Sequence, residues 1–379
     1  MEPLYDATAL GMWAYSRAAF RVVTVGPDRL ELPPGTLLVA THRRESDVPV
    51  LAPPLWRRAR VWERGRRIAF AARQDLFLHG FFAGFPPGLP PRARKLLFPV
   101  AIGRALPRVH VHPVRSATAG RLVEALAARA DEPLVDLISP GELAAFEARA
   151  RAWRLPTPAR ATDVVRGEYA DLLWRRVERG DAAADERFWA ARTAQAAADF
   201  RMLVELVRTG GRLLVFPEGS PSEDGTIGPL EPGLGALVRR ARPAALAPIA
   251  LAYDPLVRGR PRVVVHLGEP VPAAEDGDAG VLTLLRRSMP LTPGQIAASG
   301  ADAAEALAEA RAETRPVDPD LLRSRRAAER LAQARALAPS RPAEATFLAR
   351  EYESAREPAA ATPRARSRAR GRSAGAQGG

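Results

Sequence analysis

A histidine and an aspartate stand five positions apart, directly after a short apolar run. His42 ends the run "GTLLVATH", and Asp47 lies in the charged segment that follows it. On one regular helix the two side chains would point about 140° apart, because a helix has 3.6 residues per turn. We therefore expect them to meet only if His42 ends a strand and Asp47 lies in the turn beyond. There, one imidazole nitrogen could remove a hydroxyl proton while the carboxylate fixes the tautomer and stabilises the imidazolium.

Polar residues also follow two other apolar runs. Arg115 comes after the alternating segment "RVHVHPV", and Glu218 and Gly219 come after "GRLLVFP". In open α/β sheets, ligands bind beyond the carboxyl ends of the strands, where residues distant in sequence converge. We therefore expect these three residues to lie near His42.

The elements that must position these residues alternate between strands and helices. The apolar runs predict strands near residues 35–42, 108–114, 211–217, 244–253 and 262–271. Helical periodicity is found between them, at residues 118–130, 194–208 and 233–241. This alternation predicts an α/β fold with a mixed, mostly parallel sheet flanked by helices.

Composition and periodicity also predict how the chain is divided. We expect six segments: an amphipathic N-terminal segment (1–34), the first part of the catalytic domain (35–115), a helical insertion (116–200), the second part of the domain (201–275), a helical extension (276–340) and a basic, disordered tail (341–379).

The overall composition excludes some kinds of chemistry. The chain has 379 residues, no cysteine and a formal net charge of +13. Without cysteine there is no disulfide, no thiolate metal site and no cysteine nucleophile. The positive charge calls for an anionic partner, which could be a nucleic acid, a lipid surface or a phosphorylated substrate. Part of the charge lies in residues 358–379, which contain five arginines and no acid and are either a solvated extension or a tether.

Two apolar segments could contact lipid. Tyr5, Ala9, Trp13 and Phe20 have near-helical spacing with arginines beside them, which suits either a helix in a membrane interface or one packed on the domain. The other segment is rich in phenylalanine and could line an acyl-chain pocket, dock on lipid or simply form core; its members are Phe77, Phe81, Phe82 and Phe85. No run reaches the roughly 18 apolar residues of a spanning helix.

Four short blocks of the sequence together resemble the glycerolipid acyltransferase family, whose bacterial members make phosphatidic acid from lysophosphatidic acid. The blocks are "THRRESD", the strand-end Arg115, "LLVFPEGS" and "APIALAY", in this order between about residues 35 and 275. The resemblance implies that His42 is the general base and that Asp47 orients it. It also implies that Arg115, Glu218 and Gly219 bind the acceptor. Further residues of these blocks are expected at the acceptor or acyl pocket: Thr41, Phe216, Pro217, Ser220 and Pro248.

The resemblance implies an acyltransferase that acts on a glycerol-phosphate or lysophospholipid type of acceptor. The donor would be acyl-CoA or acyl carrier protein, with direct transfer to the hydroxyl and no metal or redox cofactor. The protein would work at the cytoplasmic side of the cell membrane, as a peripheral protein, and no nucleic-acid partner is expected.

Two departures from the family pattern leave the acceptor open. Thr41 stands where the family usually has asparagine, and Ser220 and Pro221 stand where it usually has threonine and arginine. That arginine often helps to hold phosphate, so a non-phosphorylated lipid alcohol is an alternative acceptor. A basic lipid- or nucleic-acid-binding protein without catalysis is the other alternative.

Other sites that the sequence could contain are less well supported. His110 and His112 could form a metal pair on one face of a strand, but no third ligand is evident and a polar edge strand explains them equally well. His79 and His266 lie among apolar residues and are interpreted as structural. The only Gly-x-Ser-x-Gly match, residues 371–375, has no strand before it, and no phosphate-binding glycine loop is present.

Overall fold

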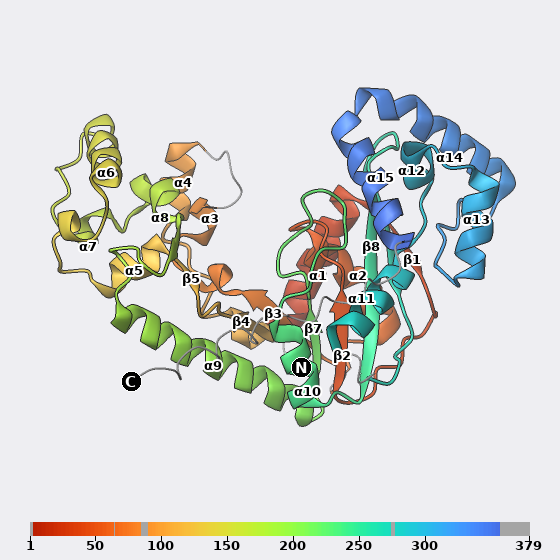
Figure 1. The fold of residues 1–379 in the computed structure, drawn as a ribbon, viewed down its shortest axis with the longest axis horizontal. Coiled ribbons are helices and arrows are strands. Elements are labelled where there is room, and N and C mark those ends of the chain that lie inside the picture. The colour runs from red at the N-terminus through yellow and green to blue at the C-terminus, as the bar shows by residue number, and fades with distance from the viewer. Residues whose placement is uncertain (1–2, 64, 85–89, 274–276, 357–379) are drawn as a thin grey trace, which may run out of the picture.

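A seven-stranded sheet forms the centre of the protein in a computed structural model, which describes residues 3–63, 65–84, 90–273 and 277–356 (Figure 1). The strand order is β1-β9-β8-β2-β7-β3-β4. Neighbouring strands run parallel except for β8 and β9, which are antiparallel. The strands are β1 (Arg21–Val25), β2 (Thr36–Ala40), β3 (Ile68–Arg73), β4 (Val111–Val114), β7 (Arg212–Val215), β8 (Ala245–Asp254) and β9 (Arg262–Leu267). The predicted α/β class with a mixed, mostly parallel sheet is confirmed.

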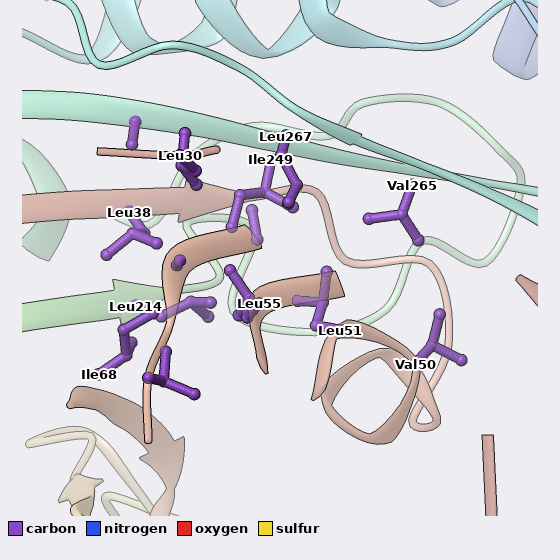
Figure 2. Close-up of a cluster of buried hydrophobic side chains, with 14 of the residues drawn as sticks. Leu30, Leu38, Val50, Leu51, Leu55, Ile68, Leu214, Ile249, Val265 and Leu267 are labelled. Atoms are coloured by element: carbon purple, nitrogen blue, oxygen red, sulfur yellow. The ribbon is translucent and has the colours of Figure 1, made fainter. Parts of the chain in front are cut away.

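The central strand β2 has helices packed on both of its faces. Because successive side chains of a strand point to opposite faces, Leu38 and Ala40 join one buried cluster while Leu37 and Val39 join another. The first cluster includes apolar side chains of α2 (Asp47–Ala59), and Figure 2 shows Leu38 of the strand in this cluster. The second includes side chains of α9 (Glu186–Arg208), α10 (Gly233–Ala241) and α11 (Gly277–Ser288). Full burial on both faces explains why this strand reads as a continuous apolar run.

Helix α1 (Pro3–Ala19) packs against α2 beside the sheet. Its inward side chains include the buried Tyr5 and Ser16. Several apolar side chains on the same helix are exposed instead: Leu4, Leu10, Trp13 and Tyr15. Within the described ranges, no helix is long and apolar enough to cross a membrane.

A helical lobe projects from the sheet between β3 and β7, at the left of Figure 1. It has its own buried cluster, in which Phe146, Tyr169 and Trp189 are the largest fully buried side chains. Its elements are α3 (Phe81–Gly84), α4 (Pro91–Leu97), β5 (Ala119–Arg121), α5 (Leu122–Ala128), α6 (Pro140–Ala152), α7 (Ala161–Val164), α8 (Ala170–Leu173) and β6 (Arg176–Glu178), with β5 and β6 antiparallel. The lobe therefore starts earlier than the insertion expected at 116–200, and α9 runs past residue 200 to lead the chain back to the sheet.

Four helices follow α11 and pack beside the far end of the sheet, at the upper right of Figure 1. They are α12 (Pro293–Ser299), α13 (Ala303–Ala312), α14 (Ser324–Leu337) and α15 (Pro342–Arg356). Short 3₁₀ turns elsewhere cover Gln74–Phe77, Leu106–Val109, Leu134–Asp136, Gly167–Tyr169 and Ala338–Ser340.

The prediction of a disordered tail from residue 341 onward is wrong for its first part. Leu348, Tyr352 and Ala355 are spaced four and three residues apart, so they lie on one face of α15, and all three are buried. That face anchors the helix to the body of the protein. The Arg-rich stretch at 358–379 lies outside the described residues.

Candidate active site

The backbone between β2 and α2 brings His42 and Asp47 together. His42 lies two residues beyond the end of β2, and Asp47 is the first residue of α2. Imidazole Nδ1 and Asp47 Oδ2 are 2.9 Å apart. The same carboxylate oxygen accepts the backbone N–H groups of Arg43 and Arg44 at 2.6 and 3.0 Å. The aspartate thus folds the turn back on itself, and the helix N-terminus favours its negative charge.

Tyr253, at the end of β8, holds the other side of this carboxylate. Its hydroxyl donates to Asp47 Oδ1 at 2.8 Å, and Asp47 is fully buried. Burial and the negative charge of Asp47 raise the pKa of Tyr253, so its hydroxyl stays protonated and remains a donor. With Asp47 accepting the Nδ1 proton of His42, the lone pair of the imidazole lies on Nε2. This is the arrangement of a general base whose tautomer is fixed.

The imidazole is 8% exposed and has an aromatic neighbour. The ring of Phe216, from the segment that follows β7, stacks on it with 4.5 Å between ring centroids and 30° between planes. Phe216, which the sequence places at a possible acceptor or acyl pocket, therefore lies against the imidazole of the dyad.

Glu218 holds the backbone of His42. Its Oε1 accepts the N–H of His42 at 2.8 Å, and its Oε2 accepts the N–H of Gly228 at 3.3 Å. The carbonyl of His42 in turn accepts the N–H of Ser222 at 2.9 Å. The loop after β7 therefore hydrogen-bonds to both the N–H and the carbonyl of His42. The carboxylate of Glu218, which was predicted to bind the acceptor, positions the backbone of His42 in this structure.

Gly219 is required by the shape of the same loop. Its φ is +73°, and a Cβ added there would lie 2.6 Å from Glu231 Oε1. Any other residue would be strained and crowded at this position. Next to it Ser220 is exposed, whereas Pro217 is buried.

Thr41 and Pro248 tie the active-site turn to β8. The hydroxyl of Thr41 accepts the N–H of Leu251 at 3.0 Å, and the N–H of Thr41 donates to the carbonyl of Ile249 at 3.0 Å. Pro248 lies inside the sheet, paired in register with Val39. Thr41 is fully buried, so its hydrogen bonds hold the turn against β8, and Pro248 belongs to the part of β8 that pairs with β2.

Arg115 lies farther from the dyad than the sequence analysis expected. It follows β4, and β7 and β3 separate that strand from β2. At about 4.8 Å per strand, the lateral separation is about 14 Å. Its guanidinium NH1 donates to both carboxylate oxygens of Asp199 in α9, each at 2.7 Å. His42, Asp47, Glu218 and Gly219 come together, and Arg115 lies apart from them.

A buried ion network behind the dyad was missed by the sequence analysis. Arg43 donates from NH1 to the carbonyl of Thr226 at 3.0 Å, and its guanidinium lies 3.7 Å from Glu218 Oε2 and 3.5 Å from Glu351 Oε1. Glu351 belongs to α15 and also accepts the amide of Gln295 at 2.7 Å. Burial raises the pKa of Glu351 to about 7, in spite of the opposing charge of Arg43. The C-terminal extension therefore reaches the turn that holds His42 and Asp47.

The other residues singled out from the sequence lie away from the dyad. His110 precedes β4 in a left-handed conformation with φ of 59° and packs edge-on against Tyr5. Phe81 packs against Phe82 and Trp174 in the helical lobe. Phe85 lies outside the described residues. In the part of the chain that the structure describes, no group of three or more His, Cys, Asp or Glu side chains could hold a metal ion.

Comparisons with known proteins find a distant structural likeness. No protein-family model matches the chain, and neither does any curated protein sequence. Among solved structures, the chain is similar to the 1-acyl-sn-glycerophosphate (LPA) acyltransferase PlsC from Thermotoga maritima, with 12% identity and a TM-score of 0.35. The match covers 71% of this chain and 70% of that one. At this level the likeness says nothing about the reaction, which has to be inferred from the side chains around His42.

Proposed function

We propose that the protein is an acyltransferase that moves a fatty acyl group from a thioester to a lipid hydroxyl. The observation that carries the proposal is the His42–Asp47 dyad, which is locked by Tyr253 on one side and by Glu218 on the other. A histidine held in a single tautomer at a strand end is suited to proton abstraction. The family resemblance of the surrounding blocks supplies the kind of hydroxyl and the kind of donor.

In the proposed reaction, Nε2 of His42 removes the proton of the acceptor hydroxyl as its oxygen attacks the thioester carbonyl of acyl-CoA or acyl carrier protein. Asp47 stabilises the imidazolium that forms. The tetrahedral intermediate then expels the thiolate, which takes the proton back from the imidazolium. The products are an ester and a free thiol, with no covalent acyl-enzyme and no need for a metal or redox cofactor.

The acceptor we propose is a glycerol-phosphate or lysophospholipid type of molecule, bound by Arg115 and by the backbone around Gly219, with the protein working peripherally at the cytoplasmic side of the cell membrane. A non-phosphorylated lipid alcohol is the second candidate. Two contacts support this second candidate. Glu218 accepts the backbone N–H of His42, and Arg115 donates to Asp199, so both side chains already have partners other than an acceptor phosphate.

The test is an acyl-transfer assay with radiolabelled acyl-CoA and a panel of lysophospholipids and non-phosphorylated lipid alcohols. His42→Ala is expected to reduce turnover by about 10²- to 10⁴-fold, the usual contribution of a general base, with an unchanged melting temperature. The matched control is His79→Ala, which removes an exposed histidine outside the dyad and should leave turnover unchanged.

Undiminished transfer by the His42→Ala variant would contradict the mechanism. If the wild-type protein transfers to no acceptor in the panel but still binds lipid, a lipid-binding protein without catalysis is favoured instead.

A further inference from the structure

A pocket lies between α1, β1, α2 and the turn that precedes β9. Its volume is about 620 Å³, which is within the usual range for sites that bind small molecules. Arg57, in its wall, follows Asp47 by ten residues on α2, so it lies about 15 Å farther along this helix than the dyad. The arginine wall of the pocket is therefore separate from the dyad, although Phe20 in the same lining packs edge-on against Tyr253 with 5.7 Å between ring centroids.

The pocket is strongly basic. Five arginines line it and a single acid, Asp28, accompanies them; the arginines are Arg17, Arg21, Arg57, Arg58 and Arg260. Arg58 is held by three backbone carbonyls in the segment 24–27 and lies 3.7 Å from Asp28. Arg57 makes no hydrogen bond or ion pair with any residue that the structure describes. Arg17 lies over the Trp13 ring, and Arg260 donates to the carbonyl of Arg17. An anion would therefore find Arg58 already anchored and Arg57 ready to bind it.

A polar group without a partner also lines this pocket. Ser16 is fully buried, and its hydroxyl has no hydrogen-bond partner within the described part of the chain. A buried hydroxyl that is left unpaired costs free energy, so a ligand oxygen able to pair with it would bind favourably. Together with the arginines, this hydroxyl fits a phosphate group, whose oxygens accept several hydrogen bonds.

The face of α1 that includes Trp13 of the pocket also carries exposed apolar side chains. Leu10, Trp13 and Arg17 are spaced three and four residues apart, so they share one face of α1. Leu10 is 64% exposed and Trp13 is 38% exposed, and the Arg17 guanidinium lies over the Trp13 ring at 5.4 Å. Exposed apolar and aromatic side chains beside basic ones are typical of helices that lie at a lipid interface.

We propose that this pocket binds the phosphate of an anionic phospholipid head group, with Leu10 and Trp13 reaching the acyl-chain boundary. The arginines hold the phosphate. The hydroxyl of Ser16 is fully buried, so it donates to a phosphate oxygen only when α1 shifts enough to open it. The exposed apolar rim is the reason to assign a lipid rather than a soluble phosphate compound, which would have no use for it. The site goes beyond the proposed acyl transfer, because it lies away from His42.

The experiment is co-sedimentation of the full chain with phosphatidylcholine vesicles that contain 30 mol% phosphatidylglycerol. It is carried out in about 0.15 M salt. An arginine near an anionic surface contributes about a fivefold factor in binding, so Arg57→Gln should weaken partitioning about fivefold. Adding Arg17→Gln should weaken it about 25-fold. The matched control is Arg325→Gln, which removes one equal charge from α14, where the side chain is 93% exposed.

Equal losses for Arg57→Gln and Arg325→Gln would overturn the proposal, because they would show diffuse attraction by net charge. Unchanged binding of the Arg57→Gln variant would overturn it as well. In a second arm, glycerol phosphate is titrated by calorimetry; tight binding that needs Arg57, without any effect of Arg57 on vesicles, would assign the pocket to a soluble ligand and reject the lipid. None of these measurements requires turnover, so their failure is distinct from failure of the proposed enzymatic activity.

Discussion

Glu351 contributes a fully buried carboxyl group to the network behind His42. Its nearest charged neighbour is Arg43, with Glu218 and Asp254 also close enough to act on it. Desolvation outweighs the attraction of Arg43, so the fold raises the pKa of this group from 4.5 to about 7. The folded protein therefore favours the protonated form.

The raised pKa predicts how stability depends on pH. The favourable contribution of a protonated Glu351 is complete below about pH 4.5 and is lost as pH rises to about 7. Glu351→Gln stays uncharged, so its free energy of unfolding relative to wild type should rise by about 3 kcal/mol across this interval. Urea unfolding of both proteins at pH 5 and pH 8 measures the difference. If wild type gains stability relative to the variant as pH rises, Arg43 holds the carboxylate ionised and the expectation is wrong.

The dyad was within reach of sequence reasoning because both of its residues belong to one turn. An apolar run, a histidine and a polar turn suffice to predict His42 and Asp47. Tyr253, which donates to Asp47, and Glu351, which contacts Arg43 behind the dyad, were not within reach, because they come from distant elements and nothing in their local sequence shows that they meet this turn. In an arginine-rich chain, nothing in the sequence distinguishes Arg43 from the other arginines. Only its burial between Glu218 and Glu351 shows that it belongs to the network behind the dyad.

At the scale of elements, the ion pair of Arg115 and Asp199 joins the edge strand β4 to α9. If Arg115 binds the acceptor phosphate, Arg115→Ala should raise the KM for the acceptor and change kcat little. Asp199→Asn should not raise the KM, since it removes the competing carboxylate and leaves the guanidinium. Steady-state kinetics of the two variants with a phosphorylated acceptor tests this. An unchanged KM in the Arg115→Ala variant, with both variants losing thermal stability equally, would reduce the pair to a structural link.

Most strands of the seven-stranded sheet were predicted from the sequence, whereas β1 and β3 were not. The missed β1 was included in the N-terminal segment, and β3 merges into the phenylalanine-rich stretch that follows it, so neither shows a clear boundary. The helix α15 was missed for another reason. Its buried positions are few, and the Arg-rich stretch that follows dominates the composition of this part of the chain.

The whole molecule contains separate hydrophobic cores. Trp189 belongs to the cluster of the helical lobe, while Leu38 belongs to a cluster between the sheet and α2 (Figure 2). Trp189→Ala should therefore loosen the lobe, because removing a buried aromatic side chain typically costs about 3–5 kcal/mol. Hydrogen exchange should accelerate in peptides from residues 122–184 and stay slow in β2, β7 and β8. Leu38→Ala is the matched control and should give the opposite pattern; uniform acceleration by either variant would show a single cooperative unit.

The contact between Arg43 and Glu351 joins the turn at the start of the chain to its last described helix. Ribosomes make the N-terminal part first, so the turn of residues 41–47 is synthesised long before Glu351. Until α15 docks, the Arg43 guanidinium has Glu218 beside it but lacks its contact with Glu351. It follows that the buried network around Arg43 is complete only after residue 351 has been made and α15 has docked. A chain cut before residue 351 would carry every residue of the dyad and still lack this buried partner of Arg43.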